Sequence, residues 1–191
     1  MSATNRGAKR KDADYYATPR NAINSLLKNY KIADPGDLIL EPSAGNGAII
    51  EAIRANGYMN HIHAIEIREE EQEALLRHAD SIAIQDYMNT DSKEKFNVII
   101  GNPPFSLAQE FIEKSLEILH PEGKLIFLLR TNFLESKKRF EWWQDKLPTR
   151  LYVLSSRPSF TGKGTDATSY SWFIWEKSCD QFEKNQEIKV I

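Results

Sequence analysis

Short apolar runs alternate along the chain with segments whose apolar residues recur at helical spacing. Nearly continuous apolar runs are typical of strands buried on both faces of a parallel sheet. Apolar residues three or four positions apart are typical of helices that cover such a sheet. The predicted strands are 38–40, 62–67, 82–84, 96–101, 125–129, 151–154 and 169–175. The predicted helices are 21–30, 48–54, 69–78, 106–119 and 136–147. We therefore expect an α/β fold with a seven-stranded, mostly parallel sheet.

Two element boundaries have specific local signals. Thr18 suits the N-cap of the first helix, and Pro19 suits its first turn. The sequence Pro-Glu-Gly at 121–123 predicts that the fourth helix ends there and that a turn leads into the next strand.

A glycine-containing segment joins the first predicted strand to the next helix. Residues 41–47 read Glu-Pro-Ser-Ala-Gly-Asn-Gly. A strand, a glycine turn and a helix form the first half of a Rossmann-like unit, in which small residues let a cofactor approach the backbone. A dinucleotide fingerprint would require a third glycine at position 50, where the chain has Ile50. The segment therefore predicts a cofactor loop of another kind.

Glu66 lies at the end of the second predicted strand, 21 residues after Gly45. A carboxylate at this point can accept hydrogen bonds from both hydroxyls of a ribose. We interpret Glu66 as a ribose ligand. The acidic residues that follow, at 69–73, are interpreted as the exposed first turn of a helix.

The fourth predicted strand stops at Gly101 and is followed by the turn Asn102-Pro103-Pro104-Phe105. The prolines fix φ and have no N–H to donate, so the turn is stiff. The amide oxygen of Asn102 and the neighbouring carbonyls are acceptors for an –NH2 group, and the Phe105 ring offers a flat face. These groups suit the exocyclic amine of a heteroaromatic base. The alternative is a proline-rich turn that only ends a strand.

The tetrapeptide 102–105 resembles the Asn/Asp-Pro-Pro-aromatic motif of S-adenosylmethionine-dependent amino-group methyltransferases. Segment 41–47 resembles that family's Glu-Pro-Ser/Ala-x-Gly-x-Gly motif, and segment 16–19 resembles its aromatic-x-Thr-Pro motif. The order of the motifs is most similar to the adenine-N6 DNA methyltransferases, including small phage-type members. The resemblance implies a Rossmann-like class I methyltransferase fold with an antiparallel final strand, and S-adenosylmethionine as cofactor. It leaves the biological role, such as restriction-modification, open.

The resemblance also implies roles for particular residues. The cofactor-binding set is Tyr16, Thr18, Glu41, Pro42, Ser43, Ala44, Gly45, Gly47, Glu66, Asp86 and Asn102. Asp86 is the match for an acidic residue that contacts the adenine amine of the cofactor. The catalytic set is Asn102, Pro103, Pro104 and Phe105. In this set the asparagine amide and the first proline carbonyl bind the target amine, and the aromatic ring stacks on the target base.

A polar loop at 155–168 follows the sixth predicted strand. If that strand is parallel to the fourth, their carboxyl ends share one edge of the sheet and the loop overhangs the turn at 102–105. This placement brings Phe160 to the base pocket and Arg157 to a phosphate. With Phe105 and Lys163, these residues form the predicted substrate-binding set. The alternative is a flexible hairpin loop.

The net charge of −2 is unevenly distributed along the chain. Residues 1–11 carry four basic and no acidic side chains, and residues 124–163 carry nine basic and three acidic ones. A basic surface of this kind suits contact with phosphates, and with the motifs it favours DNA as the partner. Three alternatives stay open: methylation of RNA base amines at adenine N6 or guanine N2, methylation of a protein glutamine amide, and nucleic-acid binding without catalysis.

Composition and length fit one domain of ordinary soluble type, because 191 residues with 41% hydrophobic side chains can bury a core. We expect a basic tail at 1–14, a methyltransferase domain at 15–178 and a polar tail at 179–191. No apolar run is long enough to cross a membrane, so a cytoplasmic location is expected. Cys179 is the sole cysteine and the four histidines lack metal-ligand spacing, so no metal site is expected. The sequence leaves the oligomeric state open.

Overall fold

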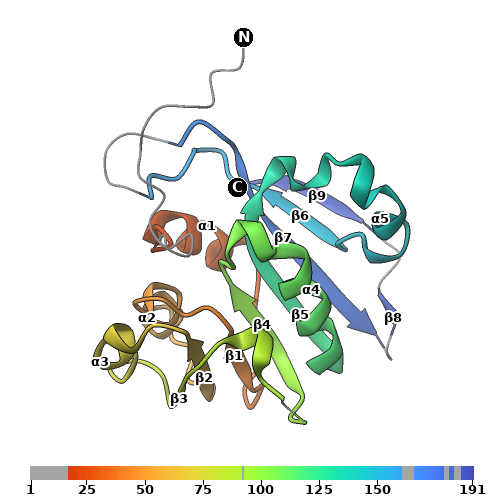
Figure 1. Cartoon of the computed structure of the whole chain (residues 1–191). Coiled ribbons are helices and arrows are strands. Elements are labelled where there is room, and N and C mark those ends of the chain that lie inside the picture. The colour runs from red at the N-terminus through yellow and green to blue at the C-terminus, as the bar shows by residue number, and fades with distance from the viewer. Residues whose placement is uncertain (1–16, 92, 161–165, 179–180, 183–185) are drawn as a thin grey trace.

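The computed structural model describes residues 17–91, 93–160, 166–178, 181–182 and 186–191, which form a mixed sheet between two layers of helices (Figure 1). The strands are β1 Ile39–Glu41, β2 Ile62–Glu66, β3 Ser81–Ile84, β4 Phe96–Gly101, β5 Leu119–Arg130, β6 Arg150–Val153, β7 Tyr170–Ser178, β8 Gln181–Phe182 and β9 Glu187–Val190. The α-helices are α1 Arg20–Asn29, α2 Ala48–Ala55, α3 Gln72–Leu75, α4 Ala108–Ile118 and α5 Phe140–Lys146. The 3-10 helices are η2 Glu69–Glu71, η3 Tyr87–Asn89, η4 Phe105–Leu107, η5 Thr131–Leu134 and η6 Lys137–Arg139.

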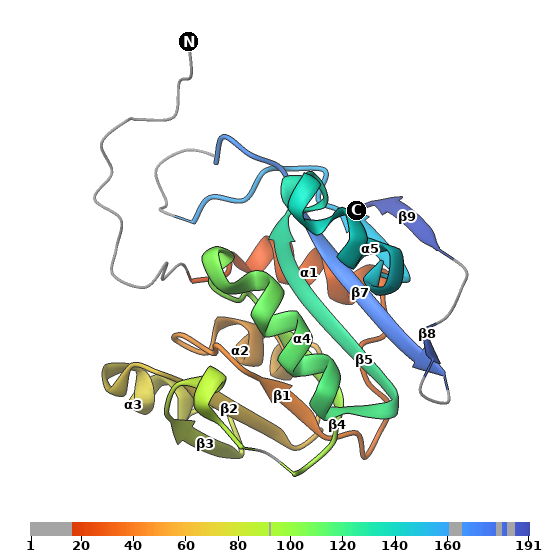
Figure 2. The same ribbon diagram turned by 45° about the vertical axis from the view of Figure 1, so that its right-hand side comes forward.

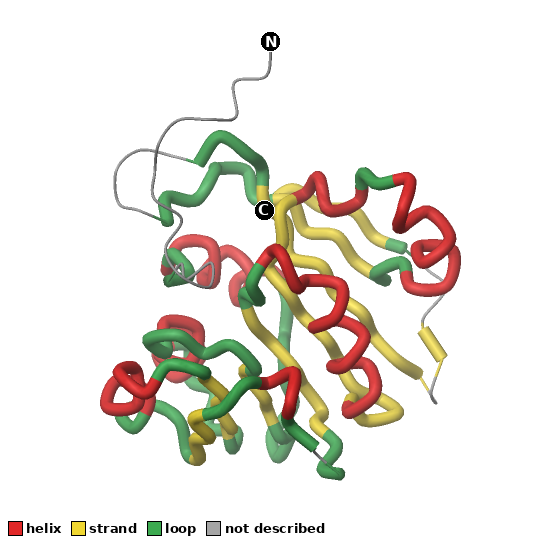
Figure 3. The backbone as a smooth tube through the Cα atoms, viewed as in Figure 1, coloured by secondary structure: helices red, strands yellow, loops and turns green. Residues whose placement is uncertain are grey.

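The strands lie in the order β3-β2-β1-β4-β5-β7-β6-β9, with β8 paired to β7 beside this path. Neighbours from β3 to β5 are parallel, whereas β7 is antiparallel to both β5 and β6. Since two reversals restore direction, β6 runs parallel to β4. The predicted α/β fold with a mostly parallel sheet and an antiparallel late strand is confirmed (Figure 3).

Each face of the sheet has its own core, because successive residues of a strand point to opposite faces. Ile39 of β1 and Val98 of β4 belong to the core under α1, α2 and α3. Leu40 and Ile99, their neighbours in sequence, belong to the core under α4 and α5. Figure 2 shows α4 on one face of the sheet and α1 and α2 on the other. Strands β1 and β4 are therefore buried on both faces of the sheet, which explains their continuous apolar sequences.

The start of α1 differs from the prediction. Pro19, not Thr18, is the N-cap residue, and no side chain makes a capping hydrogen bond. Thr18 precedes a proline, which disfavours helical geometry at that residue. The Pro19 carbonyl instead accepts the N–H of Ala22 at 3.0 Å. Thr18 is consequently available to line a cavity at the sheet edge.

Helix α4 ends at Ile118, close to the predicted end, but residues 121–123 lie inside β5 instead of forming a turn. The register between β4 and β5 shifts between Phe96 and Val98, and this irregularity accommodates the proline. A Cβ on Gly123 would lie 2.8 Å from Cγ of Leu119, so the glycine lets the strand fold back closely on its own start. The proline and glycine at 121–123 therefore do mark an irregular point in the chain, and the structure accommodates it as a bulge between β4 and β5.

Two predicted helices are shorter than expected, and the C-terminal segment adds two short strands, β8 and β9, to the seven that were predicted. The segment predicted as helix 69–78 forms η2 and the four-residue α3, and the segment predicted as helix 136–147 forms η6 and α5. Within the segment predicted as a polar tail, β9 pairs in parallel with β6. Glu187 of β9 accepts a hydrogen bond from the Arg150 guanidinium at 2.5 Å and from the Tyr152 hydroxyl at 2.8 Å. These polar contacts explain how a polar segment joins the sheet.

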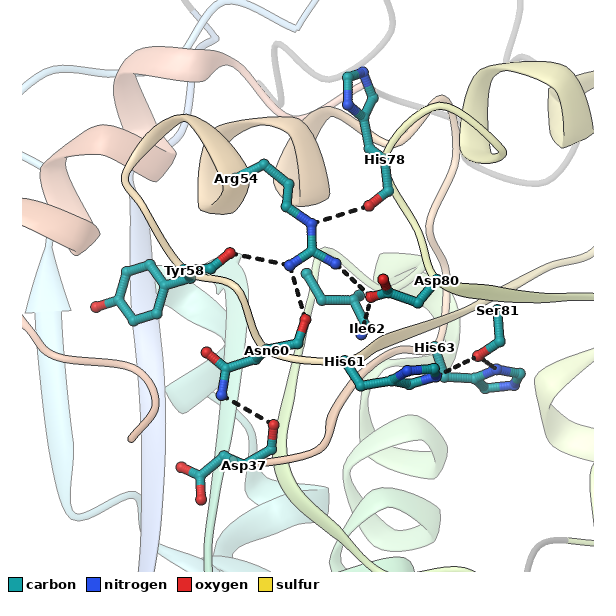
Figure 4. Close-up of polar contacts among 10 residues, drawn as sticks. All are labelled: Asp37, Arg54, Tyr58, Asn60, His61, Ile62, His63, His78, Asp80 and Ser81. Atoms are coloured by element: carbon teal, nitrogen blue, oxygen red, sulfur yellow. Dashed lines mark hydrogen bonds and ion pairs between the residues drawn. The ribbon is translucent and has the colours of Figure 1, made fainter. Parts of the chain in front are cut away.

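At the edge of the sheet where β2 and β3 begin, one arginine connects several segments (Figure 4). The guanidinium of Arg54, in α2, donates to the carbonyls of Tyr58, Asn60 and His78 at 3.0, 2.7 and 3.1 Å. It also forms an ion pair with Asp80, whose carboxylate accepts the N–H of Ile62 at 2.7 Å. Arg54 therefore fixes α2 relative to the starts of β2 and β3.

No helix in the described ranges is long and apolar enough to cross a membrane.

Candidate active site

The carboxyl ends of β1, β2 and β4 lie together at one edge of the sheet, because these strands are parallel neighbours. A cavity of about 40 Å³ lies at this edge. Its lining includes Thr18, Glu41, Ser43, Gly45, Glu66 and Asn102. The structure thus brings together residues that were predicted as cofactor ligands from four separate segments of the chain.

The loop between β1 and α2 turns sharply at its second glycine. Gly47 is the N-cap of α2 and has a φ of 78°, a left-handed value that favours glycine. A Cβ at this position would lie 3.3 Å from Cδ2 of Leu75. The N–H of Ala44 donates to the carbonyl of Ile65 at 3.0 Å and ties the loop to β2. Backbone conformation and limited space therefore both favour glycine at position 47.

Glu66 is 3% exposed, and its carboxylate connects the glycine loop to the chain beyond β2. Its Oε2 accepts a hydrogen bond from the N–H of Gly45 at 2.7 Å. Its Oε1 accepts from the backbone N–H of Arg68 at 3.0 Å and from the Arg68 guanidinium at 2.8 Å. The residue predicted as the ribose ligand therefore lies in the cavity wall, next to a basic partner that sequence reasoning missed.

Glu41 is 2% exposed, and its Oε2 has no hydrogen-bond partner among the described residues. Burial, followed by the nearby Glu66 carboxylate, raises the pKa of Glu41 well above its usual value. An unpaired ionised carboxylate is costly to bury, so burial favours the protonated form of Glu41, and a bound cation would favour the ionised form. The buried hydroxyl of Ser43 likewise lacks a partner in the described part of the chain. The wall of the cavity therefore offers two polar groups to a bound molecule.

A second cavity, of about 140 Å³, adjoins the first and shares Glu66 with it. Apolar side chains such as Ile67 and Phe111 form much of its wall, and Asp86 lies in the same lining. One Asp86 oxygen accepts a backbone N–H of η3 at 2.9 Å, and the other accepts the Asn89 amide at 3.0 Å. An apolar slot with a fixed carboxylate suits a flat base that carries an amino group.

The proline-containing turn separates the cofactor cavities from an aromatic cluster. Asn102 and Pro104 line the first cavity, while Phe105 begins η4 and contacts other rings. The ring centroid of Phe105 lies 5.6 Å from that of Tyr170 and 6.5 Å from that of Phe160. The turn therefore has polar groups on the cofactor side and an aromatic ring on the other.

The prediction that the loop after the sixth strand reaches this turn agrees with the sheet topology. Since β6 is parallel to β4, the loop begins at the same edge, and Phe160 packs beside Phe105. Arg157 is exposed in the same loop, and its contact with a phosphate stays a prediction. Tyr16 and Lys163 lie outside the described residues.

Arg130 and Tyr170 are further residues of this region that the sequence analysis missed. The Arg130 guanidinium carbon lies 4.7 Å from the Phe105 ring centroid, and its Nε donates to the Tyr170 hydroxyl at 3.4 Å. The Tyr170 hydroxyl donates in turn to Asp166 at 2.7 Å, and burial together with this hydrogen bond raises the pKa of Tyr170. A usable signal existed, because Arg130 follows directly after a predicted buried strand that ends at this edge.

Metal ligands do not gather in this site. Across the described ranges, the structure has no group of three or more His, Cys, Asp or Glu side chains placed to hold a metal ion. His61 and His63 both contact the hydroxyl of Ser81, at 3.1 and 2.8 Å, on the outer strands β2 and β3. Their nearest polar partner is thus a hydroxyl group.

Residues 39–143 match the methyltransferase small domain family. This chain belongs to that family. A viral relative, the type II methyltransferase M.CvrRI of Paramecium bursaria Chlorella virus XZ-6E, is 33% identical over 98 residues. These residues are 50% of this chain and 25% of that protein, so the chain spans about a quarter of the relative's length. The segment that matches the methyltransferase small domain includes the glycine loop, Glu66 and the turn at 102–105.

Several solved structures of methyltransferases have the same fold. The type I restriction enzyme EcoKI M protein has a TM-score of 0.68 at 19% identity, over 92% of this chain and 48% of that one. The putative RNA methyltransferase PH1948 of Pyrococcus horikoshii has a TM-score of 0.66 at 18% identity, over 92% and 94%. A putative class I S-adenosylmethionine-dependent methyltransferase of Listeria monocytogenes has 0.61 at 15%, over 90% and 62%. At these identities the likeness concerns the fold, which is the class I methyltransferase fold.

S-adenosylmethionine is the cofactor that this family and this fold indicate. It combines a sulfonium and an ammonium group with a ribose and an adenine. The two cavities fit such a molecule, because the buried Glu41 and Ser43 groups lack partners and the adjoining apolar slot is bordered by Asp86. The residues of the two cavities therefore suit S-adenosylmethionine, the cofactor indicated by the family to which the chain belongs.

Proposed function

We propose that this methyltransferase transfers the methyl group to the exocyclic N6 amine of an adenine in DNA. The observation that carries the proposal is that Asn102 lines the same cavity as Gly45 and Glu66. The acceptor for a target amine therefore lies next to the predicted cofactor site. The match to a viral type II methyltransferase supports DNA as the polymer.

The proposed roles on the cofactor side follow the positions of the polar groups. Glu66 would accept the ribose hydroxyls, sharing or replacing its hydrogen bonds with Arg68, and Asp86 would accept the adenine amine. Glu41 would face the cationic end of the cofactor, where a positive charge favours its ionised form. Thr18 and the loop 42–47 would complete the wall, and Tyr16 is proposed to extend it.

The proposed chemistry depends mainly on orientation. The cofactor supplies an electrophilic methyl group bonded to a sulfonium sulfur. An aryl amine is a weak nucleophile, because its lone pair is delocalised into the ring. Hydrogen bonds from the amine to the Asn102 amide oxygen and the Pro103 carbonyl would favour a more tetrahedral nitrogen and aim its lone pair at the methyl carbon. Pro104 would keep the turn rigid.

The aromatic cluster is proposed to hold the target base outside the duplex. An adenine in double-stranded DNA is paired and stacked, so it must be flipped out at a cost of a few kcal/mol. Stacking on Phe105, with Phe160 at the side, would offset part of this cost. Arg157 and Lys163 are proposed to contact phosphates of the same strand.

The decisive experiment is the transfer of labelled methyl groups from S-adenosylmethionine to duplex DNA, single-stranded DNA, RNA and protein in parallel reactions. We expect label in DNA, recovered as N6-methyladenine after digestion to nucleosides. The Asn102→Ala variant is the control, because it removes the proposed amine acceptor and should yield no labelled nucleoside.

Three results would contradict the proposal. Label only in RNA would identify an RNA base methyltransferase, and label in a glutamine side chain would identify a protein methyltransferase. Binding of cofactor and DNA without any transfer would identify a binding module.

A further inference from the structure

A third cavity lies at the same edge of the sheet, and Phe105 belongs to its lining. It has a volume of about 290 Å³ and shares no residue with the two cofactor cavities. Phe105 and Ala108, at the start of α4, form one wall. Arg130, at the end of β5, and Arg139, in η6, belong to the rest of its lining.

The two arginines outnumber Glu135, the acidic side chain in the same lining, so the cavity has a net positive charge. In the described ranges, Arg54, Arg68 and Arg150 form ion pairs with carboxylates, whereas neither Arg130 nor Arg139 does. Arg130 is exposed and stacks on Phe105, and it contacts the neutral hydroxyl of Tyr170. Its charge is therefore free to meet an anion.

Arg139 is held in a fixed orientation beside the cavity. Its Nε and Nη2 donate to the carbonyl of Phe133 at 3.1 and 2.8 Å, and its guanidinium carbon lies 4.3 Å from the Phe133 ring centroid. Such anchoring reduces the rotamer entropy that an arginine loses when it binds a ligand. The cavity is thus lined by one exposed guanidinium and one anchored guanidinium.

We infer that this cavity binds the nucleotide next to the target base, with its phosphate on Arg130 and Arg139. The inference rests on the proposed function, because it takes a nucleic-acid strand as the substrate. Guanidinium groups are well matched to phosphate, and the Phe105 side chain provides an apolar surface for a base. Phe105 would then be shared, with the target base and its neighbour both close to the ring.

The remaining polar lining gives the nucleotide an orientation. Glu135 repels a phosphate and accepts hydrogen bonds from a base amino group, while Asn132 both donates and accepts. The phosphate therefore lies toward the arginines and the base toward Asn132 and Glu135. This arrangement favours a neighbouring base that carries an exocyclic amine.

The test is a salt titration of DNA binding by the Arg130→Gln variant, measured by fluorescence anisotropy with a labelled duplex. Loss of one phosphate contact should lower the slope of log affinity against log salt by about 0.9. At low salt the affinity should fall by about tenfold or more. Arg130→Lys keeps the charge and should retain the wild-type slope.

Arg77→Gln is the matched control. Arg77 is an exposed arginine between α3 and β3. In the strand order, β2, β1 and β4 separate β3 from β5, which carries Arg130. It should change neither the slope nor the affinity. Unchanged cofactor affinity and an unchanged thermal midpoint for Arg130→Gln would exclude a general structural effect. A wild-type slope for Arg130→Gln would overturn the inference.

Competition experiments separate the possible anions. An excess of adenosine monophosphate should displace the duplex from wild type but not change the residual binding of Arg130→Gln. Competition by inorganic phosphate alone, with no added effect of the nucleoside, would contradict a nucleotide site. Glu135→Gln should alter the preferred base beside the methylated adenine without changing the salt slope.

Failure of this inference is distinguishable from failure of the proposed function. If wild type transfers no methyl group to DNA, the proposed function fails, whatever the salt slopes are. If wild type methylates DNA and Arg130→Gln binds and methylates it with the same salt dependence, only the present inference fails.

Discussion

The guanidinium of Arg68 lies 2.8 Å from Oε1 of Glu66 and holds this buried carboxylate against the glycine loop. Removing the carboxylate would remove charge-assisted hydrogen bonds to the cofactor ribose and leave Arg68 without this partner. We expect Glu66→Ala to weaken S-adenosylmethionine binding by about 1–3 kcal/mol, measured by calorimetry. Glu69→Ala, at an exposed glutamate of η2, is the control. Unchanged affinity would remove Glu66 from the site.

Substitutions in the turn after β4 should impair catalysis and leave cofactor binding nearly unchanged. Asn102→Ala should abolish methyl transfer while cofactor affinity stays within a few fold, because the amide is assigned to the target amine. Phe105→Ala should weaken the complex with a flipped base by about 1–3 kcal/mol, the value of one base–aromatic stack. Single-turnover kinetics and calorimetry measure the two effects. Near-normal turnover by the Asn102 variant would disprove the proposed role.

Glu41 should make stability depend on pH in an unusual direction. Its pKa is raised in the folded protein by burial and by Glu66, so the folded state keeps a proton that the unfolded state loses above a pH of 4.5. The contribution of Glu41 to the free energy of unfolding is fully present below that pH, and it decreases as the pH rises toward the pKa of Glu41 in the folded protein. Glu41→Gln should remove the decrease.

The comparison of wild type and Glu41→Gln by chemical denaturation across this pH range measures the effect. A single group can change the free energy of unfolding by at most about 1.4 kcal/mol per pH unit. A constant difference between the two proteins at every pH would show that Glu41 is ionised in both states.

Gly47 should be sensitive to the smallest side chain. Gly47→Ala adds a Cβ at a φ of 78° and at 3.3 Å from Leu75, and we expect a loss of about 1–3 kcal/mol in the free energy of unfolding. Gly36→Ala is the matched control, since its φ is 93° and no atom lies within 4 Å of the added Cβ. The difference between the variants measures the cost of the close contact. Equal losses would mean that the contact relaxes freely.

Target recognition should be short or degenerate. Outside the cofactor region, the proposed contacts with a polynucleotide come from the loop near 86–95, the segment 130–147, the loop at 155–168 and the predicted tail at 1–14. These segments offer several cations for phosphates but few groups for base edges, and phosphate contacts do not specify sequence. Affinity should decrease steeply with salt. Mapping of methylated adenines on a long DNA would contradict this view if it found a single site of six or more fixed bases.

The sequence predicted the fold and several residues that line the first cavity, because those features depend on local patterns. Continuous apolar runs identify strands buried on both faces, and the spacing from Gly45 to Glu66 follows from one strand–loop–helix–strand unit. Gly47 could be assigned to a tight turn from its position alone. The structure then placed Glu41, Glu66 and Asn102 in one cavity wall.

The sequence could not predict contacts that depend on distant pairing. Arg130 lies opposite Tyr170 only because β7 is antiparallel to β5, and the register of that pair has no local signal. The same holds for β9, where Glu187 reaches Arg150 across 37 positions of the sequence. The helix end before Pro121 was predicted, but the early start of β5 was not, because its irregular pairing with β4 depends on the partner strand.

Strand β4 lies in the middle of the strand order, and it divides the edge of the sheet that carries the cavities into two halves. Cofactor residues follow β1, β2 and β3, whereas Arg130 and Phe160 follow β5 and β6 on the other side of β4. The turn at 102–105 and the start of α4 that follows it border both kinds of cavity. We therefore expect the two halves to be separable in engineering. Replacing the segments at 130–139 and 155–169 with those of another methyltransferase should change the target sequence. The affinity of the protein for the cofactor should stay the same.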